Sequence, residues 1–62
     1  MDEHEFKEGN RVVKRGGDYT FDGVVISRFT KRSGAVRYAV ENDDGIVHIF
    51  NGKQLELKPE AT

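Results

Sequence analysis

Turn-forming residues recur at short intervals along this 62-residue chain and leave room only for short strands between them. Gly, Asn, Asp and Ser interrupt the sequence at residues 9–10, 16–18, 33–34 and 42–45, and the stretches between are rich in β-branched and aromatic side chains. No stretch shows the apolar periodicity of an amphipathic helix. The pattern therefore predicts an all-β fold.

We expect the strands to form a five-stranded SH3-like barrel. The features that indicate it are a long loop after the first strand, two hairpins and a single turn before the last strand. The expected strands span residues 11–14, 23–29, 35–41, 46–50 and 55–58, with a 3₁₀ turn at 51–54. This interpretation divides the chain into a flexible acidic tail at 1–8, the barrel at 9–58 and a C-terminal tail at 59–62.

The expected fourth strand is apolar on both of its faces. Ile46, His48 and Phe50 point one way, while Val47 and Ile49 point the other. Only one of these faces can line the interior of so small a domain. The other is expected to meet another subunit, a ligand or a partner chain.

Size and composition limit the classes of function. The chain buries little surface on folding and has no cysteine, so neither disulfides nor a thiolate metal site can stabilise it. Its two histidines lack metal-ligand spacing, and we predict no metal site. Self-association is the stabilising device that remains. The absence of cysteine and of a long apolar run predicts a soluble, cytoplasmic protein without a membrane partner.

The charged residues are unevenly distributed, although the formal net charge is only −1. Acidic residues gather in the first eight positions and around residues 41–44, whereas basic residues gather in the middle of the chain. The middle segment is either a local basic surface or a solvated face of mixed charge.

Several short sequence blocks occur in an order and spacing that are more specific together than singly. They comprise Gly9, Arg11, Val12 and Lys14 in the first strand, Gly17 and Gly23 around the next loop, Tyr-Ala-Val-Glu at 38–41, the run 45–50, and Leu55 with Glu56. In these blocks the chain resembles the type II dihydrofolate reductases, a plasmid- and integron-borne family that is unrelated in fold to the chromosomal enzyme and confers resistance to the antibiotic trimethoprim.

The resemblance implies an SH3-like barrel that assembles as a homotetramer around a central pore, where NADPH and dihydrofolate bind from opposite sides. Similar enzymes line the pore with a Val-Gln-Ile-Tyr segment, which corresponds to residues 47–50, and place a lysine near each mouth, which corresponds to Lys14. By this resemblance the expected catalytic residues are His48, Ile49 and Phe50. The expected cofactor-binding residues are Lys14, Val47, His48, Ile49 and Phe50.

The residue types in this segment suit that chemistry. Backbone N–H and C=O groups around Ile49 can bond the amide edges of nicotinamide and of a pterin, and flat rings can stack on His48 or Phe50. Alternation places Glu41 with Arg37 on the surface, so no carboxylate is positioned as a general acid and the proton must come from solvent. His48 is the one added candidate for proton transfer.

Four positions depart from the family pattern. His48 and Phe50 replace glutamine and tyrosine, and Arg28 stands where similar enzymes have a tryptophan at a subunit contact. Ile46 stands where they have a small polar residue. The alternative function is a non-catalytic SH3-like module, phage- or mobile-element-encoded, that binds protein or nucleic acid. Such a module would use the face of Ile46, His48 and Phe50, or the basic middle of the chain. Assembly state distinguishes the two functions, because a monomer encloses no pore.

Overall fold

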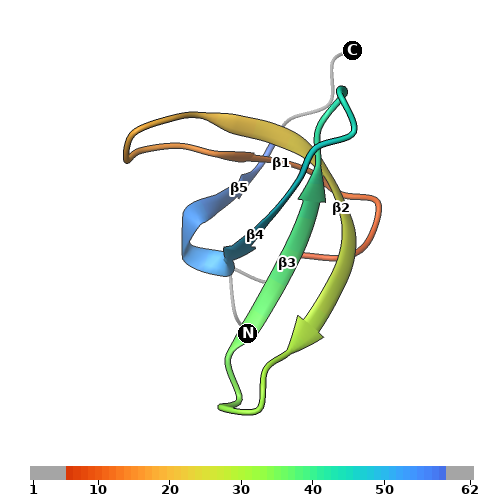
Figure 1. Ribbon diagram of the computed structural model, residues 1–62, viewed down its shortest axis with the longest axis vertical. Helices are drawn as coiled ribbons and strands as arrows, with labels where there is room; N and C mark the ends of the chain where they lie inside the picture. Colours follow the sequence, from red (N-terminus) through yellow and green to blue (C-terminus); the bar gives the residue numbers. More distant parts are fainter. Residues whose placement is uncertain (1–5, 59–62) are drawn as a thin grey trace.

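The computed structural model describes residues 6–58, which form one antiparallel sheet of five strands (Figure 1). The elements are β1 (Arg11–Lys14), β2 (Phe21–Thr30), β3 (Val36–Glu41), β4 (Val47–Asn51), the 3₁₀ helix η1 (Gly52–Gln54) and β5 (Leu55–Leu57). The sheet order is β4-β3-β2-β1-β5, so the strands curl into an open barrel whose two edges are β4 and β5. The predicted all-β, SH3-like fold is confirmed. None of the described residues belongs to a helix long and apolar enough to cross a membrane.

Strand β2 is the long strand that bends the sheet into a barrel (Figure 1). Its first half pairs with β1 and its second half with β3, with a bulge between Val25 and Ser27. The sequence predicts a strand that begins at Gly23, but β2 begins at Phe21. Gly23 is an interior position of β2, where the backbones pass so closely that a Cβ would overlap the carbonyl of Glu41. The glycine marks a close crossing rather than the start of the strand.

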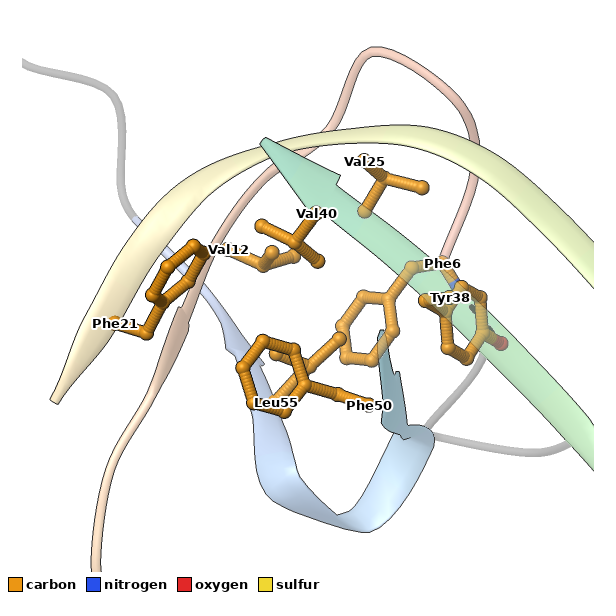
Figure 2. Close-up of a cluster of buried hydrophobic side chains, with 8 residues drawn as sticks. All are labelled: Phe6, Val12, Phe21, Val25, Tyr38, Val40, Phe50 and Leu55. Atoms are coloured by element: carbon orange, nitrogen blue, oxygen red, sulfur yellow. Dashed lines mark hydrogen bonds between the residues drawn. The ribbon is translucent and has the colours of Figure 1, made fainter. Parts of the chain in front are cut away.

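The core fills the inside of the curved sheet (Figure 2). Phe6 belongs to it, with its ring edge-on to Tyr38 at 5.3 Å between centroids and its N–H donating to the Tyr38 hydroxyl at 3.2 Å. The packed part of the chain therefore begins before Gly9, the expected start of the barrel. The remaining parts of the expected tails, residues 1–5 and 59–62, lie outside the described residues. The buried cluster consists of Phe6, Val12, Phe21, Val25, Tyr38, Val40, Phe50 and Leu55.

Side chains alternate across β3 and β4 as the sequence predicts. Tyr38 of β3 and Phe50 of β4 face the core and are each 2% exposed. Val47 and Ile49 face outward and are 44% and 52% exposed. The interior side of β4 is therefore the one that carries Phe50 and the half-buried His48.

The turns around β4 are closed by side-chain hydrogen bonds. At the β3–β4 turn the Asn42 side chain accepts the N–H of Ile46 at 3.0 Å, and Gly45 adopts a φ of +82°. In η1, the Asn51 side chain accepts the Gln54 N–H, and the Gln54 side chain accepts the Asn51 N–H. The predicted hairpin and 3₁₀ turn are both present, and together they fix the two ends of β4.

Candidate functional site

Strand β4 lies at one edge of the sheet, with β3 as its only strand neighbour among residues 6–58. Asn42 donates its N–H to the Ile46 carbonyl at 3.0 Å, which marks that opposed pair as hydrogen-bonded. Because bonded and non-bonded pairs alternate in an antiparallel ladder, the N–H and C=O groups of Val47 and Ile49 point away from β3. Asn51 follows the same rule, since its N–H bonds a side chain of η1. The edge of β4 thus presents a short row of backbone donors and acceptors.

The outward side of β4 carries apolar side chains beside this edge. Ile49 lies opposite the small Ala39 of β3, and Val47 lies opposite the half-buried Glu41. Arg37, which the sequence predicts to pair with Glu41, instead donates to the carbonyl of the preceding residue at 3.0 Å. The carboxylate therefore borders an apolar surface and has no ion pair with Arg37.

The inward side of β4, which we expect to bind a partner in the alternative function, is largely closed. Phe50 belongs to the core, so its side chain is not available to a ligand. His48 is half-buried, and only Ile46, beside the turn, is exposed. The expectation is wrong in its choice of face, because this face is the interior one. The open apolar surface is the opposite one, formed by Val47 and Ile49.

His48 lies in an aromatic setting at the rim of the core. Its ring stacks on Phe21 with 4.4 Å between centroids and 13° between planes, and it meets Tyr19 edge-on at 5.7 Å. Its Nδ1 lies 3.2 Å from the Tyr19 hydroxyl, within hydrogen-bonding distance. These contacts fix the orientation of the imidazole. Tyr19 and Phe21 are distant from His48 in the sequence, and no local signal indicates that they meet it.

Lys14 lies inside the molecule rather than at an open mouth. The residue is 5% exposed, and its Nζ donates to the carbonyls of Gly16 and Tyr19 at 2.7 and 2.9 Å. Nζ also lies 3.8 Å from the centroid of the Tyr19 ring. The ammonium therefore holds the β1–β2 loop in place, and its hydrogen bonds go to protein carbonyls.

The predicted site residues consequently fall into separate groups. Lys14 and His48 are brought together, since both contact Tyr19. Val47 and Ile49 are brought together on the outward side and at the edge of β4. Phe50 belongs to the core, where its ring lies 5.9 Å from that of His48 and 5.5 Å from that of Phe21 between centroids.

Charged side chains elsewhere on the barrel pair locally. Asp22 accepts a hydrogen bond from Lys58 Nζ at 2.6 Å, and this bond together with the positive charge lowers the pKa of the Asp22 carboxyl below its usual value. Arg15 and Glu56, both exposed, lie 3.7 Å apart. Across residues 6–58 no group of three or more histidine or carboxylate side chains could hold a metal ion.

No protein-family model matches this sequence, and none of the curated proteins matches it either. The resemblance to the type II dihydrofolate reductases therefore rests on the sequence blocks between Gly9 and Glu56.

Proposed function

We propose that this chain is a cytoplasmic dihydrofolate reductase of the type II class, which transfers a hydride from NADPH to dihydrofolate inside a homotetramer and is insensitive to trimethoprim. The observation that supports this most directly is the open edge of β4. There the backbone N–H and C=O groups of Val47 and Ile49 point away from β3, in the plane of the sheet. The family that the chain resembles uses the same segment to line its pore.

The edge of β4 suits planar ligands with amide-like rims. The carboxamide of nicotinamide and the pyrimidine half of a pterin both carry donors next to acceptors, so each can continue the hydrogen-bonding pattern of a strand. Ile49 offers its N–H and C=O on the same side of the backbone. The exposed side chains of Val47 and Ile49 add apolar contact beside those groups.

The proposal requires assembly, because one barrel alone leaves this edge open to water. Four copies around a common tunnel would enclose it and would bury the outward apolar side of β4, including Ile49. Enclosure orients two bound ligands and excludes water, and those two effects supply rate without a protein acid or base.

The reaction asks little of the side chains. When bound, NADPH supplies the hydride from its nicotinamide ring, and dihydrofolate accepts it at an imine carbon while solvent protonates the imine nitrogen. The backbone of Ile49 would bind and orient the nicotinamide and pterin rings, and the side chains of Val47 and Ile49 would exclude water from them. Glu41 is on the outward side of β3, opposite Val47, and is not required as a proton donor.

Lys14 has a positioning role in this proposal rather than the direct contact that the resemblance implies. Its Nζ is held by the carbonyls of Gly16 and Tyr19, and Tyr19 in turn contacts His48. Binding of a cofactor phosphate by Lys14 would require its release from those carbonyls. Lys14 therefore orients His48 through Tyr19.

Sedimentation combined with an enzyme assay tests the proposal. We expect the chain to sediment as a tetramer at micromolar concentration and to oxidise NADPH only when dihydrofolate is present, with or without trimethoprim. Ile49→Asp places a charge on the outward side of β4, and we expect it to dissociate the tetramer and to lower activity by more than about 100-fold, because the enclosed site is lost. Circular dichroism checks that the variant folds.

Leu57→Asp is the matched control, because Leu57 is 58% exposed on β5, the other edge of the sheet. We expect this variant to keep both assembly and activity. A monomeric wild-type chain, or a tetramer that does not oxidise NADPH with dihydrofolate, would contradict the proposal.

A second candidate function is protein binding by strand addition at the same edge of β4. It is favoured by the internal hydrogen bonds of Lys14, which leave the ammonium engaged, and by the burial of Phe50. In that case the chain is a monomer or simple dimer without reductase activity, and Ile49→Asp abolishes partner binding instead.

A further inference from the structure

The hairpin formed by β2 and β3 is the most positively charged part of the described chain. It extends beyond the body of the barrel, at the foot of the view in Figure 1. Between Asp22 and Glu41 the sequence contains four cationic side chains and no acidic one. The four are Arg28, Lys31, Arg32 and Arg37.

The acidic residues lie elsewhere, and one group of them lies at the opposite end of the same strand. Asp43 and Asp44 form the β3–β4 turn, which Figure 1 places at the other end of β3 from the β2–β3 turn. Among the described residues outside this segment, 6–22 and 41–58, there are 6 basic and 7 acidic side chains, a balance of −1, against +4 inside residues 23–40. Although the net charge is low, the end of the molecule formed by the β2–β3 hairpin is therefore basic.

An exposed aromatic ring accompanies these cations. Phe29 is 40% exposed, and it lies directly opposite Arg37 on the outward side of the β2–β3 pair. The bulge between Val25 and Ser27 causes this placement, because it shifts the alternation of β2 by one residue. A large apolar ring in a cationic setting is therefore available to solvent near the end of the hairpin.

We propose that the β2–β3 hairpin binds single-stranded nucleic acid, independently of the reductase activity. Lys31 and Arg32, both exposed at the turn, would contact backbone phosphates, while an unpaired base stacks on the ring of Phe29 beside Arg37. An acidic protein surface would match the charges, but its carboxylate side chains have no π-face to stack on the Phe29 ring. A duplex would match the charges but keeps its bases stacked on one another.

Fluorescence anisotropy of a labelled oligothymidylate, titrated with the full chain, tests the proposal. With two phosphate contacts, from Lys31 and Arg32, we expect affinity to fall about sevenfold between 50 and 200 mM salt. The double variant Lys31→Gln/Arg32→Gln removes both contacts and is expected to reduce the salt slope by about 1.4. Its NADPH oxidation should equal that of the wild type, which separates this test from that of the reductase.

Two further variants isolate the charge position and the ring. Arg15→Gln/Lys58→Gln removes the same charge outside the hairpin and is expected to leave the affinity within about twofold, since it removes no phosphate contact in this proposal. Phe29→Leu keeps an apolar side chain but no stacking surface, and we expect a loss on the order of tenfold, restored by Phe29→Trp.

Three results would overturn the proposal. The first is no change of anisotropy at low salt, which would leave an acidic protein as the partner that the basic end fits. The second is an equal loss in the hairpin variant and in the Arg15/Lys58 control, which would mean binding by overall charge. The third is an unchanged affinity of Phe29→Leu together with equal binding of duplex DNA, which would exclude base stacking.

Discussion

The inner and outer faces of this sheet are built from the same strands, but they differ in how completely their side chains are packed and bonded. On the inner face, Phe50 is in the core and even the Lys14 ammonium has protein acceptors. On the outer face, Ile49 and Phe29 remain exposed. The inner face of so small a domain therefore maintains the fold, while the outer face and the edge of β4 are free to bind other molecules.

The largest difference between the two faces is expected when one residue of each is truncated. Phe50→Ala is expected to lower the free energy of unfolding by about 3–5 kcal/mol. Such a loss is comparable to the whole stability of a domain of this size, so that most molecules would be unfolded. Ile49→Ala is expected to change it by less than about 0.5 kcal/mol in the monomer. Urea unfolding followed by circular dichroism measures both, and comparable losses would mean that the two faces are not distinct.

Gly23 tests how tightly β2 and β3 pass each other. A Cβ at this position overlaps the backbone of Glu41, which cannot move aside as a flexible side chain could. We expect Gly23→Ala to cost about 1–3 kcal/mol of stability, measured by urea unfolding. Gly16→Ala is an informative comparison, because nothing lies near its Cβ and its cost comes only from a φ of +83°. A stable Gly23→Ala variant would mean that the strands can separate without loss.

Lys14 is a charged residue on the packed inner face of the sheet. Lys14→Met leaves the carbonyls of Gly16 and Tyr19 without their donor, and we expect a loss of about 1–2 kcal/mol in thermal unfolding. The exposed Lys31, changed to Met, serves as the control and should leave the melting temperature nearly unchanged. If the two variants melt alike, Lys14 has no structural role and is available to a ligand.

The smallest expected effect comes from Asp22. Because Lys58 lowers the pKa of this carboxyl in the folded state, the pair contributes stability at pH values above the unfolded-state pKa of Asp. That contribution is lost as the pH falls below about 4 and through the folded-state pKa. Thermal unfolding of wild type and Asp22→Asn should therefore differ at pH 6 and converge in acid. A constant difference across that range would contradict the linkage.

Local sequence signals were sufficient for most of the fold. Turn residues such as Asn42 and Gly45, and the alternation of β3, act within a few neighbours, so their consequences could be read from the chain directly. The start of β2 could not be predicted in the same way. Glycine is typical of turns, but Gly23 is needed inside β2 because the backbone of Glu41, which is distant in sequence, passes close to it.

The candidate site was less predictable because its contacts join distant segments. Nothing in the neighbourhood of Lys14 shows that Nζ turns inward to two carbonyls, and nothing near His48 shows that Tyr19 and Phe21 meet it. Phe6 is a candidate tether of the acidic segment by its residue type, but nothing near it in the sequence shows that it meets Tyr38. Alternation correctly separated the two sides of β4, but only packing decides which side is interior.

The bulge in β2 has a consequence for how this chain can vary over evolutionary time. Ile26 has no opposite residue in β3, so the strand holds one amino acid more than its partner needs. Deleting it would keep Ser27 opposite Ala39 and Phe29 opposite Arg37, and the ring would stay on the same side. A one-residue deletion elsewhere in β2 moves the side chains between the deleted position and the β2–β3 turn to the opposite face of the sheet. Ile26 is thus the position in this strand where one residue can be lost while the side chains of the β2–β3 hairpin stay on the same faces.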